Sequence, residues 1–366
     1  MNRSGTDPEM PRVDDAGAGV FGEGDRLYAA MLADIAAAER HIRLESYIFA
    51  GDTVGWRFAE ALAERARAGV TVQVHVDSAG ALWQGTARLF RYLGEHGVDT
   101  RWFHRWRWRR PWRYNRRNHR KLLVVDGTTV YVGGFNLHRE SSQAAYGDRR
   151  WRDVHVRVDG ALGADAARLF DDLWRARRHT MAPPWRGDLR LVPNANGHCR
   201  RELHCLYLDA LRGAERFIDI VTPYFVPDHH LRDALAAAAR RGVAVRVLLP
   251  ARSDNPLTEL AARALAAPLL AAGVRFFEYL PRMLHGKLML VDDCWATVGS
   301  ANVDYRSFFI NQELNLVCRE PAVCARLAGI AAVDFADSRL MARSASNPLG
   351  PRAVAQGISQ RLRRWL

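Results

Sequence analysis

The chain repeats one local pattern at two places 166 residues apart. His119-Arg120-Lys121 is followed by Asp126 and, six residues later, by Gly133-Gly134-Phe135-Asn136. His285-Gly286-Lys287 is followed by Asp292 and, after the same gap, by Gly299-Ser300-Ala301-Asn302. Lys121 and Lys287 are the only lysines among 53 basic residues, so their position is specific. A repeat of this size predicts two homologous halves, each folding in the same way.

Each His-x-Lys pair stands just before a short apolar run. The runs Leu122–Val125 and Leu288–Val291 are typical of strands buried on both faces. Because residues i and i+2 of a strand face the same side, each histidine should point with its lysine into one site. Two halves related by a pseudo-twofold axis would bring the two His-Lys pairs together in a single active site.

This set of side chains suits reaction at a phosphodiester. Lysine offers a compact ammonium, where arginine offers a planar fork. Lys121 and Lys287 would hold the phosphoryl oxygens and stabilise the transition state. One histidine could attack phosphorus and form a phosphohistidine, while the other donates and accepts protons. Asn136 and Asn302 could donate to the phosphate, and the glycine-rich turns could let the backbone approach it. The scheme needs neither a metal nor a cofactor, and the near-symmetry leaves the two histidine roles open.

Four carboxylates complete the set of candidate residues. A reacting histidine needs a carboxylate that fixes its tautomer, and Asp153 and Glu313, downstream of the two motifs, are the candidates. Asp126 and Asp292 belong to the repeated pattern but lie seven residues after their histidines, at the far end of a strand about 23 Å long if extended. A structural role at the turn is favoured for them, with direct catalysis as the alternative.

The internal repeat extends beyond the motifs and predicts an α/β fold. Ala38–Ile42 and Ala214–Ile218 each open a strand, an alanine-rich helix follows, and Gly69–Val72 and Gly242–Val245 begin the next strand. Strands that alternate with helices indicate two α/β/α halves with mixed sheets. We expect a disordered tail over 1–22, an N-terminal domain over 23–182, a linker over 183–200, a C-terminal domain over 201–345 and a basic amphipathic segment over 346–366.

The charge balance favours a polyanionic partner. The net charge is +13, which suits either nucleic acid or an anionic membrane. Residues 101–117 hold eight arginines, four tryptophans, one Phe and one Tyr, a mixture that suits phosphate and the headgroup level of a bilayer. An ordinary surface loop and a nucleic-acid surface are the alternatives. The spacing over 354–366 fits an interfacial helix or a helix packed on the domain.

Other features are less informative. No apolar run is long enough to span a bilayer, and the first 22 residues hold no signal-peptide core. Five cysteines without regular spacing indicate reduced thiols in the cytosol. A surface or core role is expected for four further histidines, and the pair His229-His230 could line the mouth of a pocket. The four are His138, His155, His198 and His204.

The duplicated pattern resembles the phospholipase D superfamily. The finer context, Asn118–Lys121, Trp151–Asp153 and Gly299–Ser307 through Asn311–Glu313, is similar to bacterial cardiolipin synthases, in a short form without N-terminal transmembrane helices. The resemblance covers roughly residues 25 to 345. It implies His119 as nucleophile, His285 as acid and base, and a peripheral enzyme at the cytoplasmic face of the cell membrane.

The implied reaction makes cardiolipin from phosphatidylglycerol, with a second phosphatidylglycerol or phosphatidylethanolamine as the other lipid. The alternatives are a phospholipase D-type hydrolase, a nuclease-type phosphodiesterase, and a basic nucleic-acid or membrane binder without activity. Intact His, Lys and Asn in both halves argue against the last, and nucleic acid is the less favoured partner.

Overall fold

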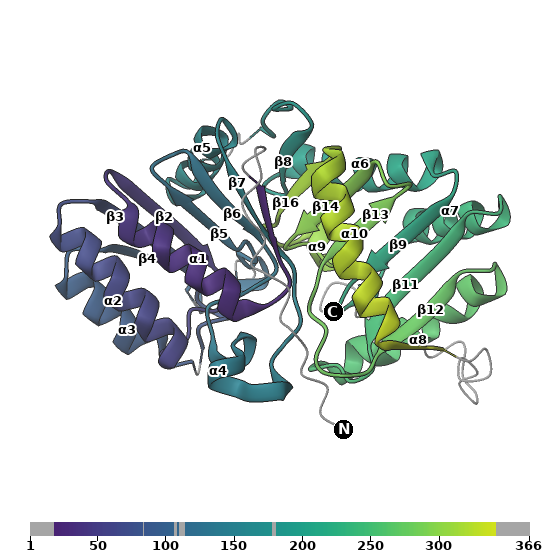
Figure 1. The fold of residues 1–366 in the computed structure, drawn as a ribbon, viewed down its shortest axis with the longest axis horizontal. Helices are drawn as coiled ribbons and strands as arrows, with labels where there is room; N and C mark the ends of the chain where they lie inside the picture. Colours follow the sequence, from purple (N-terminus) through teal and green to yellow (C-terminus); the bar gives the residue numbers. More distant parts are fainter. Residues whose placement is uncertain (1–17, 83, 106–107, 110–113, 178–180, 342–366) are drawn as a thin grey trace, which may run out of the picture.

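The structure, a computed structural model, describes residues 18–341 except 83, 106–107, 110–113 and 178–180. Figure 1 shows two halves side by side, the first coloured purple to blue and the second green to yellow. Each half is a mixed sheet covered by helices, as the sequence predicts. Among the described residues, no helix is both long enough and apolar enough to cross a membrane.

The first half forms a seven-stranded sheet in the order β1-β7-β6-β5-β2-β3-β4. Its elements are β1 (Ala18–Phe21), α1 (Gly24–Ala37), β2 (His41–Ser46), α2 (Thr53–Arg67), β3 (Thr71–Asp77), α3 (Thr86–Glu95), β4 (Asp99–Phe103), β5 (Leu122–Val125), β6 (Thr129–Gly133), α4 (Gln143–Tyr146), β7 (His155–Asp159) and α5 (Leu162–Trp174). Strands β2, β3 and β4 are parallel, whereas β5 runs antiparallel to β2.

The second half forms an eight-stranded sheet in the order β17-β12-β11-β9-β13-β14-β16-β8. Its elements are β8 (Leu189–Pro193), α6 (Gly197–Gly213), β9 (Phe217–Val221), β10 (Phe225–Val226), α7 (His229–Arg240), β11 (Ala244–Pro250), α8 (Pro256–Ala271), β12 (Arg275–Tyr279), β13 (Leu288–Val291), β14 (Trp295–Gly299), β15 (Val303–Asp304), α9 (Tyr305–Phe309), β16 (Leu314–Cys318), α10 (Pro321–Ala336) and β17 (Ser338–Leu340). Apart from β17, the strand order repeats that of the first sheet.

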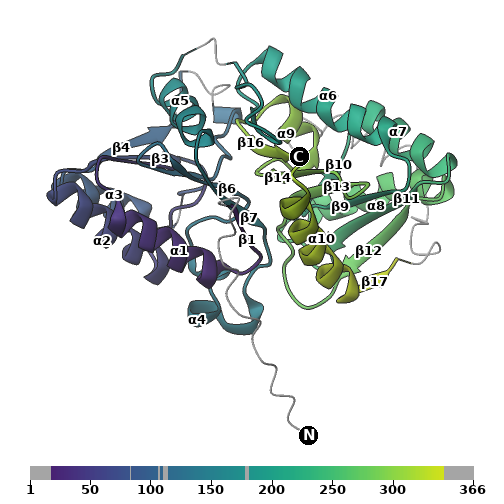
Figure 2. The same ribbon diagram turned by 45° about the horizontal axis from the view of Figure 1, so that its top comes forward.

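Helices cover both faces of each sheet, which explains why β5 and β13 are apolar along their whole length. In the first half, α1, α2 and α3 pack on one face and α5 on the other (Figure 2). In the second half, α6, α7 and α8 pack on one face and α10 on the other. The α5 and α10 faces merge into one apolar cluster, so the two halves share a core.

Equivalent helices begin in equivalent ways. The side chain of Asp52 caps α2 by accepting from Val54 N and Gly55 N. Asp228 caps α7 in the same way, accepting from His230 N and Leu231 N. An aspartate at this position accepts from backbone N–H groups that have no partner inside the helix. The duplication is therefore visible in capping as well as in strand order.

Two of the expected boundaries differ from the structure. Ala18–Phe21, expected within the disordered tail, forms β1 and pairs antiparallel with β7. Leu189–Pro193, expected within the linker, forms β8, and α6 also begins inside the expected linker. Both strands are short edge strands, where Gly and Pro are tolerated, so composition alone looks like a loop. The expected segment 346–366 lies outside the described residues.

Candidate active site

The two His-x-Lys motifs lie where the halves meet. Because β5 is antiparallel to β2, His119 and Lys121 stand at the edge where β2, β3 and β4 end. The second motif stands at the corresponding edge, since β13 is antiparallel to β9. The topology thus brings both motifs to the inner ends of their sheets.

Backbone hydrogen bonds join the halves at each motif. His119 N donates to Gln312 O at 2.9 Å, and Gln312 N donates to Arg117 O at 2.8 Å. Reciprocally, His285 N donates to Arg152 O at 2.6 Å, and Arg152 N donates to Met283 O at 2.8 Å. The exchange is reciprocal, as a pseudo-twofold axis requires.

Each histidine is held by the carboxylate of the opposite half. His119 Nδ1 lies 3.0 Å from Glu313 Oε2, and His285 Nδ1 lies 2.5 Å from Asp153 Oδ2. Gln312 and Arg152, which make the backbone exchange, directly precede these carboxylates in the chain. A proton held on Nδ1 leaves the Nε2 lone pair of the imidazole for reaction. The structure thus places Asp153 and Glu313 on the motif histidines, in a crosswise arrangement that the sequence does not reveal.

The repeated glycines make room for these carboxylates. A Cβ on Gly134 would lie 1.9 Å from Asp153 Oδ1, and one on Gly133 would lie 2.5 Å from Val154 O. At the equivalent position in the second half, Ser300 Oγ donates to Glu313 Oε2 at 2.5 Å. The space beside these turns is therefore taken by the carboxylate-bearing segments, and an approach of their backbone to a phosphate stays a prediction.

The two lysines are buried beside their histidines. Lys121 Nζ donates to His119 O at 2.7 Å, and Lys287 Nζ lies 2.8 Å from His285 Nδ1 and 3.8 Å from Asp153 Oδ2. Burial lowers the pKa of Lys287 to about 8. Burial, and then the charge of Lys287, hold the pKa of Lys121 well below its ordinary value. Two buried ammonium groups near each other favour an anion between them.

Burial favours the neutral form of both motif histidines. Burial lowers the pKa of His119, against which the charge of Glu313 acts. Burial, followed by the charges of the two lysines, holds the pKa of His285 well below its ordinary value. The carboxylates differ, since hydrogen bonds and charge around Glu313 lower its pKa despite burial, while burial raises the pKa of Asp153. The His119–Glu313 pair is therefore the better defined as a neutral imidazole beside a carboxylate.

Asn136 and Asn302 are buried near the motifs. Asn136 Oδ1 accepts from Ile48 N at 3.2 Å, and its own backbone carbonyl accepts from the Tyr28 hydroxyl at 2.5 Å. Asn302 N donates to Ser307 Oγ at 3.1 Å. Asn136 is thus held by a hydrogen bond to the segment after β2, whereas the buried Oδ1 of Asn302 has no hydrogen-bond partner among the described residues. The role of both as phosphate donors stays a prediction.

Asp126 and Asp292 lie at the far ends of β5 and β13. The carboxylate of Asp126 accepts from the backbone N–H groups of residues 39, 40 and 41, and that of Asp292 from those of residues 215, 216 and 217. These hydrogen bonds fix the entry into β2 and β9. The favoured structural role is consistent with these contacts, and direct catalysis is not, because each carboxylate is committed to the opposite end of its strand.

Three further residues shape the site without a repeated signature. The Tyr47 ring contacts the His119 ring edge-on at 5.1 Å between centroids, and Trp151 lies 5.2 Å from His285. Asp77, the last residue of β3, accepts from Asn118 N at 2.7 Å and so fixes the residue before His119. Of the three, only Asp77 carries a sequence signal for a place in the site, because it stands at the end of a strand.

The residue between His119 and Lys121 takes part in a buried ion pair. Arg120 is fully buried, with Nη1 3.9 Å from Glu45 Oε2. Burial raises the pKa of Glu45 to about 7, against the charge of Arg120. The second half has Gly286 here, and a Cβ on it would touch Val221 at 3.4 Å. The residue between the histidine and the lysine is therefore a buried arginine with an ion-pair partner in the first motif and a glycine in the second.

The remaining histidines have local roles. His138 Nδ1 lies 2.8 Å from Glu140, and His204 Nε2 lies 2.6 Å from Asp228. His155 is buried, whereas His198 is exposed. These placements agree with the expected surface or core roles. His229 and His230 begin α7 and are exposed, and a position at a pocket mouth stays a prediction.

Comparisons with known proteins support a family assignment. Residues 31–174 and 207–332 match the family described as cardiolipin synthase, phospholipase D-like domain. The chain is 32% identical over 314 residues to a probable cardiolipin synthase, YwiE, of Bacillus subtilis, covering 81% of this chain and 61% of that protein. It is also 32% identical over 340 residues to the major cardiolipin synthase ClsA of the same organism, covering 89% and 70%. The chain thus spans about two thirds of the length of these relatives.

The fold is also found in solved structures of low sequence identity. A phosphatidylserine synthase from Haemophilus influenzae aligns with a TM-score of 0.68 at 13% identity, covering 95% of this chain and 93% of that one. A polyphosphate kinase from Porphyromonas gingivalis aligns with a TM-score of 0.64 at 14% identity, covering 94% and 52%. At these identities the likeness concerns the fold. The family match and the two Bacillus subtilis relatives decide the assignment. The chain belongs to the cardiolipin synthase, phospholipase D-like domain family.

Proposed function

We propose that the protein is a phosphatidyltransferase that makes cardiolipin through a phosphohistidine. The observation that carries the proposal is the crosswise site, in which Glu313 holds His119 and Asp153 holds His285 beside two buried lysines. A neutral imidazole with a fixed tautomer, next to ammonium groups, is what attack on an anionic phosphodiester requires, and His119 with its two Nδ1 acceptors fits this best. The names of the relatives described above point to the same product.

His119 is the proposed nucleophile. Its Nδ1 faces two acceptors, Glu313 Oε2 and Ser300 O, each at 3.0 Å, so Nε2 carries the lone pair. Nε2 attacks the phosphorus of phosphatidylglycerol, the bond from phosphorus to the headgroup oxygen breaks, and glycerol departs. The phosphatidyl group is then bound to His119, while Lys121 and Lys287 hold its oxygens.

His285 is the proposed acid and base. Its pKa is depressed by burial and then by the charges of the two lysines. A bound phosphodiester anion offsets those charges, which favours uptake of a proton by the imidazole. It gives that proton to the departing glycerol oxygen. It then accepts the proton of the incoming hydroxyl of a second phosphatidylglycerol, whose oxygen attacks phosphorus and releases His119. Phosphatidylethanolamine as the other lipid would release ethanolamine instead.

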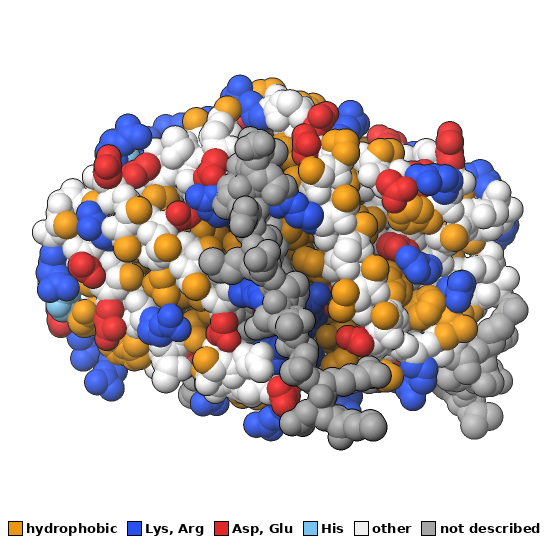
Figure 3. Space-filling model, in the orientation of Figure 1, with side chains coloured by type: hydrophobic (Ala, Val, Ile, Leu, Met, Phe, Trp, Pro, Cys, Tyr) orange, Lys and Arg blue, Asp and Glu red, His pale blue; other side chains and the backbone are white. Residues whose placement is uncertain are grey.

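The proposed place of action is the surface of an anionic membrane. In the part of segment 101–117 that the structure describes, Arg105 and Arg109 are exposed and Trp108 is 77% exposed. On the face drawn in Figure 3, basic and acidic side chains are interspersed, so that face offers no comparable basic patch among the described residues. Cys205, Cys294, Cys318 and Cys324 are free thiols, which suits the cytoplasmic side.

The test is to mix purified protein with phosphatidylglycerol vesicles and to identify the lipids by mass spectrometry. Cardiolipin and free glycerol, both lost in His119→Ala, are the expected products. Rapid denaturation at alkaline pH should leave a phosphatidyl adduct on the peptide that contains His119. Phosphatidic acid without cardiolipin would make the protein a hydrolase. Turnover of DNA or RNA but not of lipid would make it a nuclease.

A further inference from the structure

We propose that a groove on the first half binds an acyl chain of the lipid whose phosphate reaches His119. The groove lies between the loop after β3, the start of α3 and the end of β4, and Ala81, Leu82, Ala87, Trp102, Arg105 and Tyr114 line it. This inference rests on the proposed function and adds to it a binding site for the apolar part of the substrate.

The groove opens at the same sheet edge as the first motif. Strands β3 and β4 end at this edge, and β5, which follows Lys121, starts there. Tyr47 lies between the two sites, because its ring contacts His119 while its carbonyl packs on the loop after β3, where a Cβ on Gly80 would lie 2.1 Å from Tyr47 O. Tyr47 therefore contacts both His119 and the loop that carries the groove residue Ala81.

The lining suits an acyl chain that enters from an anionic headgroup region. Ala81, Leu82, Ala87 and Trp102 offer carbon atoms, and Leu82 is 52% exposed, so its side chain is free to contact a bound chain. Arg105 lies on the wall, and Tyr114 stacks on the Arg117 guanidinium at 4.0 Å. Arg105, which is exposed, can meet an anionic headgroup region, and the apolar groups match the lipid tail.

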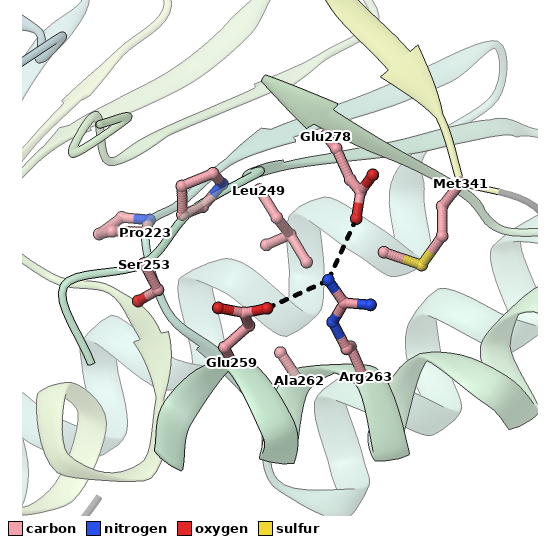
Figure 4. Close-up of a pocket in the computed structure, with 9 residues that line it drawn as sticks. Pro223, Leu249, Ser253, Glu259, Ala262, Arg263, Glu278 and Met341 are labelled. Atoms are coloured by element: carbon pink, nitrogen blue, oxygen red, sulfur yellow. Dashed lines mark hydrogen bonds and ion pairs between the residues drawn. The ribbon is translucent and has the colours of Figure 1, made fainter. Parts of the chain in front are cut away.

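The equivalent pocket of the second half is closed to such a chain. It lies between β11, α8 and β12, and Arg263 occupies it, with Nη2 3.1 Å from Glu259 and 3.5 Å from Glu278 (Figure 4). Its space is about 330 Å³, against about 850 Å³ for the groove, both including their open mouths. An acyl chain placed here would strip water from charged groups without replacing it. Of these two equivalent sites, the groove on the side of His119 is therefore the larger and the more apolar.

The test compares the binding of two anions by calorimetry, without turnover. Wild-type protein should bind monomeric dihexanoyl phosphatidic acid at least about tenfold more tightly than inorganic phosphate. Ala87→Trp, which fills the groove from the exposed start of α3, should remove this preference and leave phosphate binding as a check of the fold. Leu260→Trp, on the exposed face of α8 in the second half, is the matched control and should keep the preference.

Equal affinity for both anions in the wild type would overturn the proposal, as would a lipid preference that survives Ala87→Trp. The measurement does not depend on the reaction catalysed. A protein that fails to make cardiolipin but shows the lipid preference would refute the proposed function and keep the groove. Loss of phosphate binding in Ala87→Trp would call for Leu82→Glu, which places a carboxylate on the same wall and should remove the lipid preference.

Discussion

At the scale of single residues, the two histidines depend on partners from the other half. The pairs His119–Glu313 and His285–Asp153 join residues 194 and 132 positions apart in the chain. Each carboxylate is almost fully buried, so its orientation is set by packing. Changes at these positions should therefore act on chemistry more than on lipid binding.

Glu313→Gln keeps the shape of the side chain but removes its charge. We expect kcat to fall by about 10²- to 10⁴-fold, because His119 loses the carboxylate charge beside Nδ1 and keeps only Ser300 O as a full acceptor there. Asp153→Asn should act in the same direction through His285. Steady-state kinetics would measure the effect, with thermal unfolding as the control for the fold. A kcat within threefold of wild type would contradict the crosswise roles.

The lowered pKa of Lys287 predicts that anion binding depends on pH. The pKa of Lys287 is lowered to about 8, so its ammonium is charged below that pH and neutral above it. Affinity for tungstate, which stays a dianion in this range, should be constant up to about pH 8 and then fall by as much as tenfold per pH unit. The motif histidines, with lowered pKa values, are already neutral there. Titration calorimetry on wild type and Lys287→Met would check this, since the variant should lose the step attributed to Lys287.

At the scale of elements, the turns after β6 and β14 place the carboxylates. Gly134 contacts Asp153, and Ser300 bonds Glu313, so each turn acts on the carboxylate of its own half. That carboxylate then reaches across to the histidine of the other half. The spacing between Asp126 and Gly133, repeated in the second half, fits the length of one strand and its turn.

Gly134→Ala tests this placement. The added Cβ would lie 1.9 Å from Asp153 Oδ1, so the turn and the carboxylate cannot both keep the positions that place Asp153 beside His285. We expect kcat to fall by at least about 10²-fold, the size of a lost acid or base contribution. Ser300→Ala removes one hydrogen bond and adds no clash, and it should cost less. Equal activity of Gly134→Ala and wild type would show that the turn does not position Asp153.

Asp126→Ala tests the motif aspartate. Three backbone N–H groups would lose their acceptor at the entry into β2, which should destabilise the protein by about 1–3 kcal/mol. Chemical denaturation would measure the loss, and activity per folded molecule should stay near wild type. A large fall in kcat with unchanged stability would return Asp126 to a direct role in catalysis.

At the scale of the whole molecule, the halves share an apolar core. The cluster that contains Leu122 and Val124 also contains Leu288 and Leu290. Arg152 adds a buried ion pair across the halves, with Nε 2.7 Å from Asp334 of α10. A repeat protein with such an interface should not unfold half by half.

Calorimetry would test this cooperativity. We expect one thermal transition whose calorimetric and van't Hoff enthalpies agree. Asp334→Ala would leave Arg152 buried with fewer acceptors and should lower the stability of the whole protein by about 3–5 kcal/mol. Two separate transitions in the wild type would mean that the halves are independent.

Much of this organisation could be predicted from the sequence, because it repeats. The two sheets, the buried strands after each motif and the pairing of each histidine with its lysine follow from a periodic pattern. The crosswise partners do not, since nothing in the order of residues says which histidine Asp153 meets. The edge strands β1 and β8 were missed because short strands with Gly or Pro look like loops.

The reciprocal pairing also has a consequence for ancestry. It is the arrangement that two identical subunits would make about a twofold axis, here joined in one chain. Identical subunits would have to carry identical residues, whereas joined halves are free to diverge. This chain has used that freedom, with Glu313 opposite Asp153 and with Arg120 where the other copy has Gly286. Two histidines with the same role in a symmetric ancestor could thereby acquire different roles, one as the nucleophile and one as the acid and base.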